Sequence, residues 1–422
     1  MRFVCLLLTA LACRAASLGP SVSDIDHLYP GMEALYIEIH SNPELAFQEK
    51  QTAAKLAARV KELGYEVTTG VGGTGVVAVL KNGAGPVVLL RTELDALPVT
   101  EQTGLQFSSK TPGVMHACGH DLHMAAWAGT AQWMAAHRNG WHGTLMLIGQ
   151  PAEEAGGGAS AMLKDGLFVR FPKPDFALAL HDDDSLAAGV IGYHAGFFRA
   201  AADFPTVTIF GRGGHGAMPQ NTVDPVVIAA RTILAWQTIV SRENDPQNPV
   251  VVTVGAIHGG TKNNIIPDQV QLLLSIRTFD PMVRKRVLAA IARIAKAEAE
   301  AAGAPREPLI EPTPGMVGDE AVYNDPDLTN RLAAALKKNM AAGNVVEMPA
   351  KMTSEDFSEY GRAGVKAALL HIGAVDPEKL AESRRTGVPV PAPHSPQWAP
   401  VRDITLKAAV QAETIALLDL LN

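Results

Sequence analysis

The sequence has little charge, few cysteines and no long apolar run. Charged residues make up 19% of its 422 residues and hydrophobic ones 47%, which is typical of a folded globular protein rather than a disordered one. Acidic residues outnumber basic ones, and the net charge of -7 argues against nucleic acid as the main partner. No apolar stretch approaches the ~20 residues of a membrane-spanning helix. The chain is too long for a single ordinary core, so we expect two domains.

The first seventeen residues have the pattern of an export signal. Arg2 supplies a positive charge, residues 3–12 are apolar, and small residues in Ala10-Leu11-Ala12 and Ala15-Ala16-Ser17 offer two cleavage sites. A buried N-terminal strand is the alternative interpretation, although a Gly-Pro pair separates this stretch from the rest of the chain. We therefore expect residues 1–17 to be a signal peptide and the protein to be periplasmic or secreted.

The position of cleavage decides how many cysteines the exported protein keeps. The cysteines are Cys5, Cys13 and Cys118, so cleavage after Ala12 leaves two and cleavage after Ser17 leaves one. With a single cysteine no intramolecular disulfide can form, and Cys118 is free to bind metal even in an oxidising compartment. The residues before Cys13 also resemble a weak lipoprotein cleavage box, so a lipid anchor on Cys13 is a second interpretation.

The richest group of metal-binding side chains lies between residues 116 and 124. It consists of three histidines, one cysteine and one aspartate: His116, Cys118, His120, Asp121 and His123. Thiolate and imidazole are good zinc ligands, and carboxylate is an acceptable one. Cys118 and His120 are two residues apart, so an extended chain places both on one side, and a helical pattern follows. A capped helix start with incidental histidines is the alternative, but the full set favours a metal site with further ligands from elsewhere.

Further candidate ligands follow short apolar runs that we predict to be buried strands. These runs span residues 76–80, 87–90, 143–148 and 176–180. Ligands of an open α/β sheet bind beyond the carboxyl ends of its strands, where Asp95, the pair Glu153-Glu154 and His181 fall. One glutamate could bind metal while its neighbour acts as general base on water, although a solvated acidic turn is the alternative.

The middle of the chain has a different pattern. Longer alternating strands and two helices follow the order βαββαβ of a ferredoxin-like layer. The predicted elements are a strand at 204–210, a helix at 224–242, strands at 250–257 and 270–279, a helix at 281–302 and a strand near 309. We therefore interpret residues 199–308 as a second domain inserted into the first, which comprises residues 18–198 and 309–422.

Eight motifs in order resemble those of one group of metal-dependent amidohydrolases. They are Arg91–Pro98, His116–Asp121, Gln150–Glu154, Leu180-His181, Gly211–His215, Gly259–Pro267, Ser354–Phe357 and Pro393–Pro396. The group includes hippurate hydrolases, N-acyl-amino-acid amidohydrolases and plant indole-acetyl-amino-acid hydrolases, a branch of the aminoacylase–carboxypeptidase family. The resemblance spans roughly residues 30–415. It implies a zinc-peptidase-like α/β catalytic domain with a central mixed sheet, and an inserted ferredoxin-like α+β domain that serves as lid and dimerisation domain.

The resemblance also implies the parts of a catalytic site. Two adjacent divalent ions are expected, and the Cys118 thiolate is able to bridge them. The expected metal ligands are Cys118, His120, Glu154, His181 and His394. Glu153 matches the catalytic base, which moves a proton from water to the leaving amine. Zinc, manganese, cobalt and nickel all suit such a mixed nitrogen, oxygen and sulfur set.

Other residues of the motifs are expected to support the ligands. Asp95 is expected to orient His120, and His116 and Asp121 to lie behind the ligands rather than bind metal. Spacing alone leaves His116 open as a ligand, because it shares a side with the two ligands that follow it. His371 lies within an apolar run and is expected to be a core histidine with satisfied hydrogen bonds.

The inserted domain is expected to contact substrate through His215, Asn264 and Arg277. Arg277 can form a bidentate pair with a carboxylate, and His215 can donate a hydrogen bond to the oxygen of the scissile carbonyl. The resemblance implies that His215 reaches into the site of a partner subunit. We therefore expect a homodimer or homotetramer.

The expected reaction is metal-dependent hydrolysis of the amide bond of N-acyl amino acids, with hippurate-like or acetyl-amino-acid substrates. A dipeptidase or carboxypeptidase acting on small peptides is the alternative, because the ligand set does not separate it from an acyl-amino-acid hydrolase. A non-catalytic binding protein with the same fold is a third interpretation. The intact glutamate pair and the full ligand set argue against it.

Overall fold

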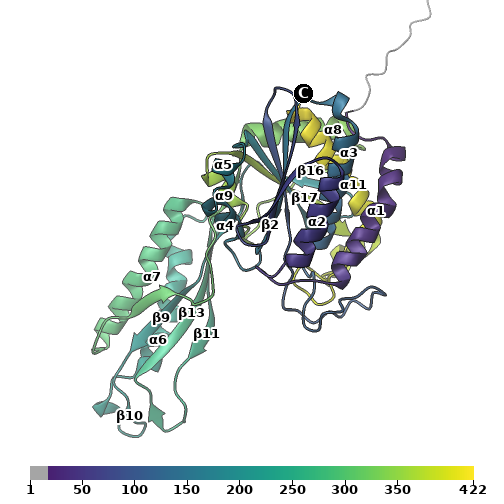
Figure 1. Ribbon diagram of the computed structural model, residues 1–422. Helices are drawn as coiled ribbons and strands as arrows, with labels where there is room; N and C mark the ends of the chain where they lie inside the picture. The colour runs from purple at the N-terminus through teal and green to yellow at the C-terminus, as the bar shows by residue number, and fades with distance from the viewer. Residues whose placement is uncertain (1–17) are drawn as a thin grey trace, which may run out of the picture.

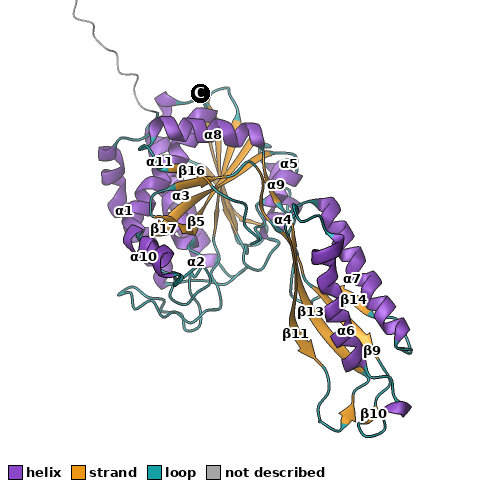
Figure 2. Cartoon of the chain, turned by 180° about the vertical axis from the view of Figure 1, so that it is seen from behind, coloured by secondary structure: helices purple, strands orange, loops and turns teal. Residues whose placement is uncertain are grey.

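The computed structural model describes residues 18–422, so the predicted signal peptide and Cys13 lie outside the described part of the chain. Figure 1 shows a larger α/β unit from which a slender arm extends. The arm, residues 201–312, has a sheet of its own, and Figure 2 shows two long helices along one side of that sheet. Over residues 18–422, no helix has both the length and the apolar character that crossing a bilayer requires.

The larger unit is built on an eight-stranded mixed sheet of order β1-β2-β4-β3-β5-β17-β6-β16. Its strands are β1 Glu66–Val71, β2 Gly75–Asn82, β3 Val87–Glu93, β4 Gly143–Gln150, β5 Phe176–Ala187, β6 Ile191–Tyr193, β16 Val345–Glu347 and β17 Lys366–Val375. β4, β3, β5 and β17 form the parallel centre, and β1 and β2 continue it in antiparallel fashion. The four apolar runs are therefore strands, as predicted.

Helices cover both faces of this sheet. One face packs on α1 Val22–Ser41, α2 Lys50–Glu62, α3 His120–Ala136, α8 Pro326–Asn339 and α11 Arg402–Leu420. The other face packs on the shorter helices α4 Gly158–Lys164, α5 Leu167–Arg170 and α9 Ser358–Arg362. Val76 and Ala78 belong to the first core and Val77 and Val79 to the second, because successive side chains of a strand point to opposite faces. Burial on both faces explains why these strands are almost entirely apolar.

The arm follows the predicted order βαββαβ. Its elements are β9 Pro205–Phe210, α6 Pro225–Thr238, β11 Val250–His258, β13 Gln269–Thr278, α7 Pro281–Ala301 and β14 Leu309–Pro312. The strands are antiparallel in the order β11-β13-β9-β14, and β8 Ala201–Asp203 pairs with β13. Trp236 is fully buried in the arm's own apolar core, where its indole N–H donates to the carbonyl of Ile291 at 3.0 Å. The short strands β10 Gly214–His215 and β12 Ile265–Ile266 pair at the tip (Figure 1).

One predicted strand end differs in the structure, and a helix that was not predicted is present. His181 was predicted to end its strand but lies inside β5, because the neighbouring β17 continues to pair with β5 beyond it. The helix α10 (Pro377–Thr386), for which no element was predicted from the sequence, follows β17. This helix has a proline at its first turn, and the side chain of Asp376 accepts hydrogen bonds from its first backbone N–H groups.

Candidate active site

A cavity of about 620 Å³ lies where the central strands, the arm and the connections between them meet. Residues predicted as metal ligands, as base and as substrate contact line it together: Cys118, Glu153, Glu154, His181, His394 and Arg277. His120 is fully buried, and its Nε2 lies 3.9 Å from an oxygen of Glu153 and 3.9 Å from an oxygen of Glu154. The structure therefore brings the five predicted ligands and the predicted base into one place.

A glycine allows Cys118 and His120 to lie against β5. Gly119 has a φ of +76°, a region that favours glycine, and a Cβ on it would collide with the carboxylate of Asp182. α3 begins at the next residue. The turn leaves the Cys118 sulfur 3.6 Å from Nε2 of His181.

Backbone carbonyls set the orientation of two histidine rings. His120 donates through Nδ1 to the carbonyl oxygen of Asp95 at 2.8 Å, and His181 donates through Nδ1 to the carbonyl oxygen of Asp182 at 2.8 Å. In both rings Nδ1 therefore carries a proton, so Nε2 is the nitrogen that can bind a metal ion when the ring is neutral. This is the arrangement that a metal-binding histidine requires.

The glutamate pair is held by Asp95. Its carboxylate accepts the backbone N–H groups of Glu153 and Glu154 at 3.1 and 2.9 Å. Asp95 thus contacts His120 through its carbonyl, as well as through a carboxylate oxygen 3.6 Å away, and also fixes the loop after β4. On the far side, Glu154 Oε2 lies 3.4 Å from His394 Nε2.

The donor atoms fit divalent metal ions. The thiol, imidazole and carboxylate groups form two sets that share Cys118, one with His120 and His181 and one with Glu154 and His394, each with donor atoms within 4.8 Å of one another. Nε2 of His120 and Oε1 of Glu154 are buried and find no hydrogen-bond partner among residues 18–422, which is unfavourable unless a cation satisfies them. Burial raises the pKa of the Cys118 thiol, and neighbouring carboxylates add to this, so the thiolate needs a cation beside it.

The two glutamates differ electrostatically. Burial raises the pKa of Glu153 well above its usual value, and the negative charges of Glu355, Glu154 and Asp356 raise it further. Burial also opposes ionisation of Glu154, but the hydrogen bond with His394 and the proximity of His120 lower its pKa. Two neighbouring carboxyls whose pKa values are pushed apart are typical of an acid–base group next to a charged ligand.

Sequence reasoning assigned no role to a buried ion cluster next to the pair. The Arg91 guanidinium is fully buried and forms ion pairs with Glu93, with Glu355 at 2.7 Å and with Asp356 at 3.0 Å. Gln150 joins it by accepting from Arg91 Nε at 3.0 Å. All these residues lie in or next to motifs noted in the sequence, but Arg91 and Glu355 are 264 residues apart, so no local pattern could connect them.

The cluster continues toward the metal ligands through Glu93. The Glu93 carboxylate contacts both Arg91 and His123 Nδ1, the latter at 3.1 Å. His123 Nε2 in turn accepts the backbone N–H of Asp182 at 2.8 Å, so both nitrogens of His123 are used and it is not available as a ligand. Asp182, for which the sequence suggested no role, also accepts from the indole of Trp398 at 3.0 Å. The sequence signal that could have indicated a role for Asp182 is its position directly after the predicted ligand His181.

Asp121 and His116 are buried, and the structure shows different surroundings for each. Asp121 accepts from His40 Nδ1 at 2.6 Å, and the other nitrogen of His40 lies 3.2 Å from Glu101. Burial alone would lower the pKa of His40, but these two carboxylates raise it to about 9. Neither nitrogen of His116 has a hydrogen-bond partner within the described chain, and burial lowers its pKa to about 4. Support of the ligands by Asp121 and His116 stays a prediction.

The predicted substrate contacts of the arm do not come together within one chain. Arg277 lines the cavity and donates to the hydroxyl of Ser354 at 2.9 Å. His215 is exposed at the tip of the arm, where the N–H of Gly216 donates to the carbonyl oxygen of Asn264 at 2.8 Å. The tip lies at the end of the arm far from the central sheet (Figure 1).

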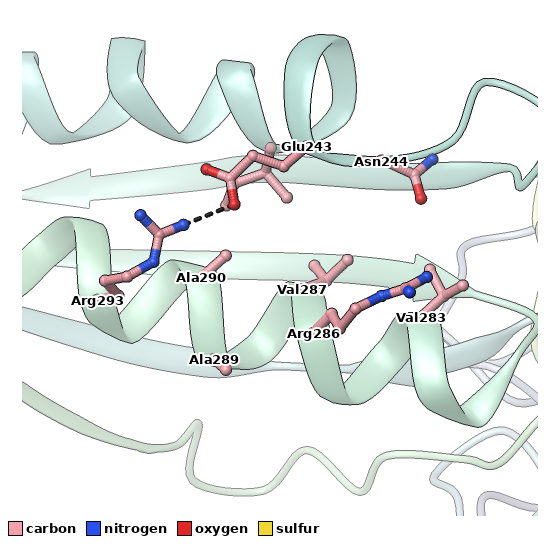
Figure 3. Close-up of a pocket in the computed structure, with 9 residues that line it drawn as sticks. Glu243, Asn244, Val283, Arg286, Val287, Ala289, Ala290 and Arg293 are labelled. Carbon is pink, nitrogen blue, oxygen red and sulfur yellow. Dashed lines mark hydrogen bonds and ion pairs between the residues drawn. The ribbon is translucent and has the colours of Figure 1, made fainter.

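A second cavity, of about 500 Å³, lies within the arm between α7 and the π-helical turn Ile239–Glu243 that extends α6 (Figure 3). Val283 and Val287 contribute apolar walls, and Glu243 pairs with Arg293 at 2.6 Å across it. Neither histidine nor cysteine lines it. It therefore offers no chemistry comparable to that of the first cavity.

Comparison with known proteins identifies the family to which the chain belongs. The model of peptidase family M20/M25/M40 matches residues 89–385. The hippurate hydrolase of Campylobacter jejuni is 41% identical over 286 residues, which cover 68% of this chain and 73% of that protein. Thermostable carboxypeptidase 2 of Saccharolobus solfataricus is 36% identical over 331 residues, 76% of this chain and 81% of that protein. The crystal structure of the Bacillus subtilis YxeP protein, a dinuclear metal-binding peptidase, superposes with a TM-score of 0.77 at 27% identity and covers 94% of this chain and 99% of that one.

The chain therefore belongs to peptidase family M20/M25/M40. It has the zinc-peptidase-like α/β fold predicted from the sequence, and it is a metal-dependent hydrolase of amide bonds.

Proposed function

We propose that the protein hydrolyses the amide bond of N-acyl amino acids, with Glu153 as general base. The observation that carries this proposal is the position of Glu153: its carboxylate lies 3.9 Å from His120 Nε2, next to the two donor sets that share Cys118, and Glu153 lines the cavity. Its neighbour Glu154 has the partner His394, whereas no histidine of the described residues lies as close to Glu153. One carboxyl thus serves as a ligand and the other remains free to move a proton.

The ligands Cys118, His120, Glu154, His181 and His394 would hold two divalent ions, with Cys118 common to both donor sets. Zinc, manganese, cobalt or nickel would supply the charge that polarises the scissile carbonyl and makes water more acidic. Glu153 takes the proton from the attacking water and delivers it to the leaving nitrogen.

Arg277 binds the carboxylate next to the scissile nitrogen. It is half-buried in the cavity wall, and within residues 18–422 it forms no ion pair with a carboxylate. His215 and Asn264 complete the site from the arm of a partner subunit in a homodimer or in a homotetramer, because their own arm holds them away from their own cavity. The arm therefore acts as both lid and dimerisation domain.

A carboxypeptidase or dipeptidase is the second candidate, and the similarity to the Saccharolobus solfataricus carboxypeptidase is the observation that favours it. Both reactions need the same ligands, the same base and a cation for the substrate carboxylate. The two differ in the group on the acyl side, which is an amino acid in a peptide substrate.

A substrate panel tests the proposal. The purified protein, reconstituted with each of the four metals, is assayed with N-benzoyl-glycine, N-acetyl amino acids and free dipeptides. The proposal expects the highest kcat/KM among the N-acyl amino acids. Faster turnover of dipeptides would favour the second candidate, and no turnover of either class would refute both.

The location of the protein is also a proposal. We infer export from residues 1–17, with a periplasmic or secreted mature protein, or one anchored by lipid on Cys13. A single remaining thiol, Cys118, is compatible with an oxidising compartment.

A further inference from the structure

Arg199 is a buried cation in the wall of the active-site cavity, and nothing in the proposed reaction uses it. Its side chain is only 7% exposed. Its Nε donates to His371 Nε2 at 3.2 Å, and Nη1 donates to the hydroxyl of Thr353. Since arginine cannot accept, His371 Nε2 is the acceptor, and Nδ1–H of His371 donates to Asp183 at 2.5 Å. His371 is therefore a satisfied core histidine, as predicted, and both partners of Arg199 are neutral.

The charge of Arg199 has no direct counter-charge. In the part of the chain that the structure describes, Arg199 forms no ion pair, whereas Arg91, which is also buried, has three carboxylate partners. A buried charge without an opposite charge is unfavourable in the absence of a ligand. Nη2 of Arg199 donates to no atom of residues 18–422, but it is not completely enclosed by protein. Because Arg199 lines the cavity, a ligand in the cavity can reach Nη2.

The backbone fixes Arg199 next to the predicted carboxylate site. Arg199 ends β7 (Gly196–Arg199), which lies beside the segment 351–354: the N–H of Ala200 donates to the carbonyl of Thr353 at 2.9 Å. The next residue, Ser354, accepts from Arg277. The two guanidinium groups are thus bonded to hydroxyls of consecutive residues, whose Cα atoms are about 3.8 Å apart.

The third cation of this wall is already paired. Lys351 Nζ lies 2.6 Å from Asp183 and 3.4 Å from Asp184. Lys351 therefore has two carboxylate partners, and Arg199 and Arg277 are the cavity cations that lack one within residues 18–422.

We propose that Arg199 binds a second anionic group of the substrate, so that the preferred substrates are dianionic N-acyl amino acids. This rests on the proposed function, in which Arg277 binds the carboxylate beside the scissile nitrogen. The second carboxylate belongs either to an acidic amino acid side chain or to a dicarboxylic acyl group. Both sources present a carboxylate to the Arg199 guanidinium, which can bind it through Nη2, the nitrogen that has no protein partner among the described residues.

Matched substrate pairs distinguish the two sources. N-acetyl-glutamate is compared with N-acetyl-glutamine, and N-succinyl-glycine with N-butyryl-glycine, in the metal-reconstituted enzyme. We expect the acidic member of one pair to have a kcat/KM at least about 30-fold higher, which is ~2 kcal/mol at 1.4 kcal/mol per factor of ten. The pair that shows the preference identifies the end of the substrate that Arg199 contacts. No preference in either pair overturns the proposal.

Variants separate recognition from a structural role. Arg199→Met should lower the acid-to-neutral ratio of kcat/KM to near one, while kcat for the neutral substrates is retained. Arg199→Lys, which keeps the charge, should retain part of the preference. Lys338→Met is the control for the loss of one positive charge: Lys338 is exposed near the end of α8 and does not line the cavity, so the ratio should not change. An equal loss for acidic and neutral substrates in Arg199→Met would show that Arg199 only supports His371 and Thr353, and would refute the proposal.

Equilibrium binding separates this proposal from the proposed function. If the wild-type enzyme hydrolyses no N-acyl amino acid, the proposed function fails. The Kd values of both pairs, N-acetyl-glutamate with N-acetyl-glutamine and N-succinyl-glycine with N-butyryl-glycine, for wild type and Arg199→Met then decide the present proposal. Tighter binding of the acidic ligand that disappears in the variant supports it, and equal Kd values refute it.

Discussion

Glu413 makes the stability of the fold depend on pH. It is 6% exposed in α11, and the hydroxyl of Thr130 in α3 donates to its Oε2 at 2.6 Å. Burial raises its pKa from 4.5 to about 8. Because the folded state binds this proton more tightly than the unfolded state, the stabilisation is fully present below about pH 4.5 and is lost as the pH rises through about 8.

The size of the effect follows from the two pKa values. Their difference, at 1.36 kcal/mol per pH unit, corresponds to ~5 kcal/mol between the two ends of this range. Glu413→Gln replaces the protonated carboxyl with a neutral group of the same shape and does not titrate. Urea unfolding of wild type and variant between pH 5 and 9 should therefore show a free energy of unfolding that shifts in favour of the variant as the pH rises, by up to ~5 kcal/mol.

Comparing the two proteins at each pH removes the contributions of all other titrating groups. Glu62→Gln, at an exposed position at the end of α2, controls for the loss of one surface carboxylate. If the free energies of unfolding of wild type and Glu413→Gln change with pH in parallel over the whole range, the reasoning is refuted. Parallel curves would mean that the Glu413 carboxyl has the same pKa in the folded and unfolded states.

Five further predictions concern activity, processing and assembly. Chelation should abolish turnover and a divalent ion should restore it; full activity in a preparation shown to be metal-free by elemental analysis would contradict the metal site. Glu153→Gln should keep the metal and lose a factor on the order of 10² or more in kcat, whereas Glu154→Gln should lose metal affinity, and the opposite pattern would exchange the two roles. N-terminal sequencing of protein from its native host should find a start within or just after the first seventeen residues, and an unprocessed N-terminus rules out cleavage. Arg277→Ala should raise KM strongly for free acids and much less for their esters, because the lost charge pair costs ~2–5 kcal/mol of binding free energy. Mixed dimers of Glu153→Gln and His215→Ala subunits should recover part of the activity if the histidine acts across the interface.

Local signals in the sequence indicated Cys118, His120, the glutamate pair and His181 as candidates, whereas His394 was indicated only by the resemblance to the amidohydrolases. Cys118 and His120 are two residues apart, and the pair Glu153-Glu154 directly follows a run of buried apolar residues. Buried parallel strands read as apolar runs, and their carboxyl ends meet at one edge of the sheet. The same argument predicted His181 at the site although it misplaced the end of its strand, since pairing with β17 extends β5 beyond it.

The long-range ion pairs could not be predicted in this way. In the sequence, Arg91 is a charged residue at the end of an apolar strand. Its partners Glu355 and Asp356 come from the other half of the catalytic unit and reach it only in the folded chain. The contact of His123 with Glu93 likewise depends on how α3 crosses β3, which no spacing in the sequence encodes. Whether a histidine binds metal or a backbone N–H is decided by such tertiary contacts.

The arginines around the cavity differ in whether a carboxylate of the protein compensates their charge. Arg91 is compensated by three carboxylates and so stabilises the fold without a ligand, whereas Arg199 and Arg277 rest on neutral hydroxyls and imidazole. A ligand with two carboxylates gives both guanidinium groups an opposite charge and so relieves the unfavourable burial of both, whereas a ligand with one carboxylate relieves that of only one. Ligand stabilisation grows as RT ln(1 + [L]/Kd), so at equal concentration a dianionic product or inhibitor should raise the Tm more than its neutral-side-chain analogue. Arg199→Met should cancel this difference and leave the shift due to Arg277 in place, because the two guanidinium groups are anchored to different hydroxyls.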